Sequence, residues 1–359
     1  MLRTKIKGVT VAIVMGLLTV GNIHTEAAGG VSSDQAVDMQ LNTPVSGTLS
    51  GENSSEWYLF QTGPEESYYV FQTDCNSATG VEFALYSDDS EENEALGMVV
   101  GGNSSLSRTV KLNPADTYYI CMTNEEEKVN GQYSLSVKEV KDDVSDTAEE
   151  ARWTIYDRAT TGTLEVTGDR DVYKLKTGRK DIPLRAVFKN LTSNSQLNFA
   201  IYRASDLEDS QIVAKGQNVS KGASKYYEVM LKKNTIYYVV VDGNDSGTYE
   251  FYFENLYEKL APAKTKVKAS SSRKKAVLSW NRMDYVHAYE VYVSTYKKGG
   301  YRLLSTISSG YITSKTTSTL KKGTYYFKVC GVATVDIAGT GNRQTIRTLY
   351  SAPKKVTIK

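Results

Sequence analysis

The sequence of 359 residues predicts an all-β protein built from three β-sandwich modules in tandem after a signal peptide. Three observations lead to this prediction. Short runs rich in tyrosine and β-branched residues alternate with clusters of glycine, asparagine, aspartate and serine, which is the pattern of strands joined by polar turns. A long segment occurs twice in the first two thirds of the chain, and the last hundred residues have a different composition.

The N-terminus has the three-part layout of a secretory signal peptide. A basic start at residues 3–7 precedes an apolar run from Val9 to Val20 and a polar stretch from Gly21 to Glu26, with cleavage expected near Ala27 or Ala28. The apolar run is shorter than the ~20 residues that a spanning helix needs. We therefore expect residues 1–28 to be removed and the mature chain to have no transmembrane segment. It would be secreted and extracellular, either released or held non-covalently at the cell surface.

The internal repeat has a period of about 115 residues. A period this long indicates a duplicated domain rather than a solenoid, and we place the two copies at residues 31–142 and 144–256. The offset between matching segments drifts only slightly, as loop insertions between strands would cause. The matches pair Gly47-Thr48-Leu49 with Gly162-Thr163-Leu164, Glu56-Trp57-Tyr58 with Asp171-Val172-Tyr173, Phe83-Ala84-Leu85-Tyr86 with Phe199-Ala200-Ile201-Tyr202, and Gly131-Gln132-Tyr133 with Gly247-Thr248-Tyr249.

Each copy reads as a series of short strands. In the strand around Tyr118, period-two alternation places Tyr118, Ile120 and Met122 on one face and Cys121 on the other. No helix longer than a turn or two is expected, with residues 147–156 as the one exception considered. The strands predicted in the first copy are 57–61, 68–73, 82–86, 117–123 and 132–138.

On these motifs, both copies resemble the bacterial pre-peptidase C-terminal domain. The shared pattern is a Gly-Thr-Leu opening, an acid before an aromatic-rich strand, a turn into a Tyr-Tyr strand, and a final Gly-x-Tyr strand. The resemblance implies jelly-roll-like sandwiches. Domains of this family are usually appended to secreted peptidases, where they are implicated in substrate binding or secretion. This chain contains no peptidase domain, so a role as accessory subunit of a separately encoded peptidase stays open.

The last module, residues 261–359, is more basic and has a different pattern of predicted strands. A tryptophan lies in the early strand Ala276–Trp280, Tyr-Glu-Val-Tyr follows at Tyr289–Tyr292, and Gly323-Thr324-Tyr325 opens a late strand. These features resemble the fibronectin type III domain, which implies an immunoglobulin-like sandwich that binds, spaces or presents. Alternation along the late strand predicts Phe327 inward and Cys330 outward. The three resemblances together are typical of a secreted bacterial, Firmicutes-like protein.

Charge is distributed unevenly along the chain, although the formal net charge is only +2. Residues 31–142 carry 5 basic and 19 acidic side chains, a net −14; residues 143–256 carry −2; residues 257–359 carry 20 basic and 4 acidic side chains, a net +16. A basic module attracts anionic surfaces such as an envelope polymer. The alternatives are that each module only solvates itself, or that the acidic and basic ends of neighbouring molecules attract each other.

Histidine is too scarce for imidazole-based catalysis. Only His24 and His287 occur, and His24 lies in the predicted signal peptide. His287 has no nucleophile motif around it, and the count excludes zinc enzymes that are built on two or three histidines. The glycines from Gly97 to Gly102 lack the Gly-Lys-Ser/Thr ending of a phosphate-binding loop. We therefore predict a protein that is not an enzyme and assign no catalytic residue, while carboxylate-based catalysis is not excluded by counting.

Two sites remain open at this stage. Cys75 and Cys121 lie in the first module of an exported chain, so they either form a disulfide or remain thiols. The acidic loop Asp88–Glu94 offers oxygen ligands to calcium, but it lacks the ligand spacing of a known calcium loop. A solvated loop is the favoured interpretation, and no cofactor or metal ligand is assigned.

These observations favour a secreted or surface binding protein of the adhesion type. Its partner would be an extracellular glycan, a protein or an anionic envelope polymer, and nucleic acid is not expected. The 26 tyrosines invite a glycan-stacking hypothesis, although tyrosine also suits half-buried strands. A structural spacer or self-assembling matrix component is the alternative, and the ligand-binding residues stay unknown.

Overall fold

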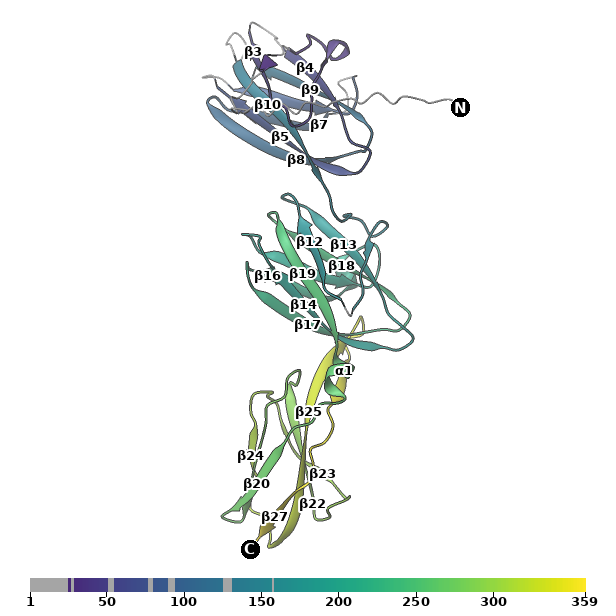
Figure 1. The fold of residues 1–359 in the computed structure, drawn as a ribbon, viewed down its shortest axis with the longest axis vertical. Helices are drawn as coiled ribbons and strands as arrows, with labels where there is room; N and C mark the ends of the chain where they lie inside the picture. The colour runs from purple at the N-terminus through teal and green to yellow at the C-terminus, as the bar shows by residue number, and fades with distance from the viewer. Residues whose placement is uncertain are drawn as a thin grey trace, which may run out of the picture. The chain divides into compact units, whose positions relative to one another are not determined.

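The computed structural model describes residues 25–26, 29–50, 55–76, 80–89, 94–124, 131–156 and 158–359. Nearly all regular structure in these residues is β-strand, arranged as sandwiches in tandem (Figure 1), which confirms the predicted fold class. The chain divides into two compact units, residues 1–140 and 141–359. None of the described helices is both long and apolar enough to cross a bilayer. The predicted signal peptide falls outside the described residues except for Thr25–Glu26.

The first unit contains two five-stranded sheets in its described part, with strand orders β1-β3-β10-β5-β8 and β2-β4-β9-β6-β7. Alternate side chains of both sheets, such as Phe71 from β5 and Phe83 and Ile120 from β6 and β9, form one core. The strands are β1 (Thr25–Glu26), β2 (Val37–Asp38), β3 (Val45–Leu49), β4 (Ser55–Gln61), β5 (Ser67–Cys75), β6 (Val81–Tyr86), β7 (Glu94–Val100), β8 (Ser104–Leu112), β9 (Thr117–Asn124) and β10 (Gly131–Lys141), and a 3-10 turn, η1, spans Ser33–Gln35.

The second unit begins with a sandwich of the same strand order. Its sheets run β11-β13-β18-β15-β16 and β12-β19-β14-β17, which correspond one to one with β2-β4-β9-β6-β7 and β3-β10-β5-β8. The sequence repeat is thus also a repeat of topology. The elements are β11 (Arg152–Trp153), β12 (Thr160–Leu164), β13 (Arg170–Lys176), β14 (Ile182–Asn190), β15 (Leu197–Tyr202), η2 (Asp209–Gln211), β16 (Ile212–Val219), β17 (Ser224–Leu231), β18 (Ile236–Gly243) and β19 (Gly247–Asn255).

The Gly-Thr-Leu motif has a packing cause in both copies. In the second, Tyr173 and Tyr249 are buried, their hydroxyls lie 2.7 Å apart, and Tyr249 donates a hydrogen bond to Asp171. A Cβ on Gly162 would collide with both hydroxyls. In the first copy Glu56, Tyr58 and Tyr133 make the same arrangement over Gly47. In both copies a Cβ on the motif glycine would collide with the hydrogen-bonded group of one acid and two tyrosines, which therefore requires glycine at this position.

The rest of the second unit forms a further sandwich with a separate core around Trp280, Tyr289 and Phe327. The long strand β25 pairs with β22, β26 and β27, and its end runs parallel to the edge strand β17 through Val229 and Met230. This pairing covers an edge that would otherwise expose unpaired backbone groups. The elements are α1 (Leu256–Leu260), β20 (Val267–Ser272), β21 (Lys275–Trp280), β22 (Ala288–Ser294), β23 (Arg302–Ile307), β24 (Ser314–Thr316), β25 (Gly323–Ile337), β26 (Arg343–Arg347) and β27 (Lys354–Ile358).

Cys75 and Cys121, for which a disulfide and two thiols were both left open, are not joined in the structure. Cys75 packs between the two sheets of the first unit, in the cluster that holds Phe71. Cys121 belongs to a different cluster, with Trp57 and Ala84. As the alternation along β9 predicted, Cys121 points away from the core that its neighbour Ile120 enters. The sheet itself therefore lies between the two sulfur atoms.

The helix considered for residues 147–156 and the outward position of Cys330 are both wrong. Residues 147–156 contain no helix, because this segment pairs with β13 instead: Val172 N donates to Ser145 O, and Thr154 N donates to Lys174 O. Phe327 is buried as predicted, but Cys330 is buried too. Its thiol faces Glu290, and Arg347 from β26 covers that carboxylate with two hydrogen bonds of 2.9 Å.

Candidate metal centre

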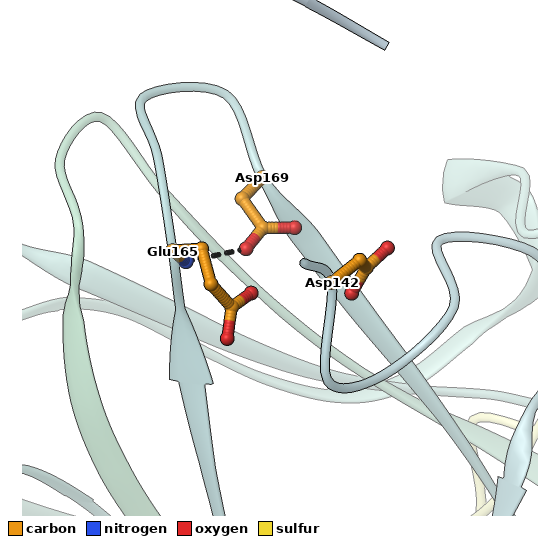
Figure 2. Close-up of side chains that lie close together, drawn as sticks. All are labelled: Asp142, Glu165 and Asp169. Atoms are coloured by element: carbon orange, nitrogen blue, oxygen red, sulfur yellow. Dashed lines mark hydrogen bonds between the residues drawn. The ribbon is translucent and has the colours of Figure 1, made fainter. Parts of the chain in front are cut away.

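Carboxylates converge at one end of the second unit's first sandwich. Asp142 and Asp143 lie on the segment that enters the sandwich, Glu165 follows the last residue of β12, Asp169 precedes β13, and Asp171 lies within β13. Figure 2 shows the side chains of Asp142, Glu165 and Asp169 on three converging pieces of chain. The carboxylate oxygens of these three residues lie within 4.8 Å of one another, and the same holds for Asp142, Asp143 and Asp171.

Backbone hydrogen bonds hold this arrangement in place. Asp169 accepts from Glu165 N through Oδ2 and from Arg170 N through Oδ1, both at 2.6 Å, which closes the loop between β12 and β13 (Figure 2). Gly168 has a φ of +87°, a conformation that glycine adopts at little cost. On the entering segment, Val144 N donates to Asp142 Oδ1 at 3.0 Å. Local backbone hydrogen bonds therefore help to position these acids.

Two of these oxygens are buried without a hydrogen-bond partner. Asp171 is 0% exposed, and while its Oδ2 accepts from Tyr249, its Oδ1 has no partner; Glu165 Oε2 is in the same situation. A buried charge without compensation is costly. A proton or a cation at these oxygens would remove this cost.

The electrostatics agree with this interpretation. Burial, followed by repulsion from Asp169, Asp143 and Glu165, raises the pKa of Asp171 to about 9, although the hydrogen bond from Tyr249 opposes the rise. Burial, the contact with Asp169 and the surrounding acids raise the pKa of Glu165 to about 9. Burial also raises the pKa of Asp143, partly offset by Arg152. The fold thus keeps several acids together that repel one another when ionised.

This donor set suits a hard divalent cation. Ca²⁺ takes six to eight oxygen ligands in a flexible geometry, whereas Mg²⁺ demands a near-ideal octahedron and zinc prefers nitrogen and sulfur. The described cluster offers carboxylate oxygens, without a histidine or cysteine among its members. Asp142, Glu165 and Asp169 would be the first ligands, with Asp143 and Asp171 supplying further negative charge. A bound cation would neutralise the buried oxygens and tie residues 142–143 to the β12–β13 loop.

No sequence motif pointed to these residues. The acidic loop Asp88–Glu94, which offers oxygen ligands to calcium in the sequence, lies largely outside the described residues. One signal was available: the positions that hold Glu165 and Asp169 in the second copy hold Ser50 and Ser54 in the first, and only Asp171 has an acidic counterpart, Glu56. Acidic residues that are present in the second copy but not in the first, next to the ends of two strands, are the sequence signal that indicates this site.

No protein-family model matches the chain, and no curated protein matches it. Solved structures similar to parts of it include a Fn3-like protein from Clostridium thermocellum, at 27% identity over 27% of this chain and 93% of that one, with a TM-score of 0.22. The pre-peptidase C-terminal domain of collagenase from Bacillus anthracis is 22% identical over 28% of this chain and 93% of that domain, with a TM-score of 0.25. A two-domain fibronectin type III segment of chicken tenascin is 12% identical over 51% and 98%, with a TM-score of 0.20.

Proposed function

We propose that this chain is an extracellular binding protein built from tandem β-sandwich modules, and that calcium holds part of its second unit in the functional form. The binding partner would be an extracellular glycan, a protein or an anionic envelope polymer. The observation that carries the calcium proposal is the buried, unpartnered Oδ1 of Asp171 beside Asp142 and Asp143. Sandwich modules of this kind place ligands on loops and sheet faces, and a cation that fixes a loop preserves such a surface.

Calcium is the cation that fits both the ligands and the expected location. Extracellular calcium modules commonly bind with dissociation constants of about 10⁻⁴ to 10⁻³ M. Each of the acids in the cluster adds negative charge, which strengthens binding of a divalent ion. Residues 142 and 143 come from outside the sandwich strands, so the cation would fasten the entering segment to the β12–β13 loop.

The first prediction is that the full chain binds one calcium ion at this cluster. Asp169→Asn is expected to weaken the affinity by about tenfold or more, because it removes a charge from the centre of the site, an effect of roughly 1.4 kcal/mol. Isothermal titration of the calcium-free protein with CaCl₂ measures this. Asp206→Asn, an exposed acid of the same unit, is the matched control and should titrate like the unmodified protein.

Titration with MgCl₂ is the selectivity test. We expect magnesium to bind at least tenfold more weakly, because the clustered carboxylates do not leave it the several waters that it keeps. The calcium proposal would be wrong if the chain took up no calcium, or if Asp169→Asn and Asp206→Asn changed the affinity to the same extent.

A further inference from the structure

A cleft of about 580 Å³ lies in the second unit, where the loops before β22 and after β23 meet strands β14 and β17. Its volume is in the range of small-molecule sites. Three tyrosines line it: Tyr226 from β17, Tyr285 from the loop before β22, and Tyr311 from the loop after β23. This cleft shares no residue with the carboxylate cluster.

Two of the tyrosine rings remain exposed to solvent. Tyr226 is 56% exposed and Tyr311 is 75% exposed, although burying an aromatic ring is among the larger gains available to a fold. The Arg282 guanidinium lies over the Tyr311 ring, 4.3 Å from its centroid. The pair presents a flat aromatic face beside hydrogen-bond donors, which is an arrangement suited to a flat ligand with polar edges.

The opposite wall is rigidly held. The Arg185 guanidinium lies between the rings of Tyr226 and Tyr285, 4.2 and 4.3 Å from their centroids. Glu228 accepts two hydrogen bonds from this guanidinium, at 2.8 and 2.5 Å, and is itself 2.8 Å from His287 Nε2. Because Glu228 holds Arg185 and Arg185 packs on Tyr226, the Tyr226 ring is pre-organised before a ligand binds.

One residue of this wall has a strained backbone, and the facing loop approaches the wall closely. Tyr285 has a φ of +62°, which is rare for a bulky residue, and its hydroxyl is anchored by a 2.8 Å hydrogen bond to Glu254. On the facing loop, a Cβ on Gly310 would collide with the carbonyl oxygen of Val286. That close approach brings Tyr311 up to Arg282. Strained residues of this kind cluster at functional sites.

The charges around the cleft nearly balance. Arg185 is neutralised by Glu228, and Asp284 offsets Arg282 on the same loop. The remaining polar lining consists of His287 and of hydroxyl groups, those of Ser308 and Ser309 among them. A wall of guanidinium donors, carboxylate acceptors and hydroxyls matches a ligand rich in hydroxyl groups rather than one with a strong net charge.

We propose that this cleft binds a neutral glycan, with sugar rings stacked on Tyr311 and Tyr226. Arg282, Asp284 and Ser308 would bond the sugar hydroxyls. The inference locates the binding function proposed above and does not depend on the cation, since the two sites are made of different residues.

The test is binding of the full chain, in excess calcium, to neutral cello-, xylo-, manno- and chito-hexasaccharides. We expect at least one of them to bind. Tyr311→Ala should weaken that affinity about tenfold, the equivalent of losing one aromatic stacking contact, and Arg282→Gln should weaken it as well. Tyr296→Ala is the matched control, because Tyr296 is 73% exposed and does not line the cleft; its affinity should be unchanged.

Two further probes distinguish other ligand classes. Polygalacturonate tests an acidic glycan, and polyglutamate tests an acidic peptide. The proposal is overturned if none of the neutral hexasaccharides binds, if only an acidic probe is retained, or if Tyr311→Ala and Tyr296→Ala have equal effects. Calcium titration of the same variants should be unaltered, so a failure here is separate from a failure of the calcium site.

Discussion

Without calcium, the second unit is expected to lose stability as the pH rises from about 5 to about 8. The ordinary pKa values of an aspartate and a glutamate are 3.8 and 4.5, whereas in the folded chain those of Asp171 and Glu165 are about 9. Folding therefore takes up protons in this window. The stability that these protonated acids contribute is fully present below about pH 4 and is lost as the pH rises towards 9.

The size of this loss of stability can be calculated from the one proton that Asp171 takes up on folding. Each pH unit changes the free energy of unfolding by about 1.4 kcal/mol per proton taken up, so Asp171 alone accounts for roughly 4 kcal/mol between pH 5 and pH 8. Glu165 is only partly buried and adds less, because solvent screens its charge. For a single unit this is a large share of a typical total stability.

Calcium is expected to remove most of this pH dependence. The cation competes with protons for the same oxygens, so its effect grows as the pH rises. Calcium at a hundred times its dissociation constant adds about 2.7 kcal/mol of stability. Urea unfolding of the full chain at several pH values, in EDTA and in calcium, measures both slopes.

Asp171→Asn gives the matched variant. It keeps a side-chain oxygen for Tyr249 but removes the buried charge, so at pH 8 in EDTA it should be more stable than the unmodified protein and should respond less to calcium. Asp206→Asn should retain the full pH dependence. Equal pH slopes in EDTA for Asp171→Asn and the unmodified chain would contradict the assignment of the buried charge.

The substitution Gly162→Ala is expected to destabilise the second unit by about 3 kcal/mol, near the upper end of overpacking effects. The added methyl would collide with the hydroxyls of Tyr173 and Tyr249. These rings cannot move aside, since both are buried and Tyr249 is hydrogen-bonded to Asp171. Either the strand β12 shifts or the acid loses its partner.

Gly178→Ala is the control, because its Cβ would have no atom within 4 Å; we expect a change of less than about 0.5 kcal/mol. Urea denaturation in calcium measures both variants, and the first unit, which keeps its own Gly47, supplies an internal reference. A change for Gly162→Ala as small as for Gly178→Ala would mean that the tyrosine pair does not impose the glycine.

The strands could be predicted because each depends on a short local pattern. Alternation along Tyr118–Met122 and the matched Gly-Thr-Leu motifs both survive in the structure, including the outward position of Cys121. The burial of Cys330 could not be predicted from its strand. It depends on Arg347 and Glu290, which come from two other strands and cover the face that alternation assigns to solvent.

The two proposed sites are non-local, which is why sequence patterns did not reveal them. Asp142 and Glu165 are more than twenty residues apart in the sequence. They come together because the segment that follows Asp142 pairs with β13. The cleft joins Tyr226 to Tyr311 across two sandwiches. The sequence shows that acids and tyrosines are abundant. Only the topology shows which of them lie together.

Anomalous diffraction from crystals of the full chain soaked in terbium, a calcium substitute, tests the central claim most directly. The predicted result is a single strong peak about 2.3–2.6 Å from the carboxylate oxygens of Asp142, Glu165 and Asp169, displaced by added calcium and weaker in Asp169→Asn. A peak confined to other residues, or no peak in the unmodified protein, would contradict the calcium site.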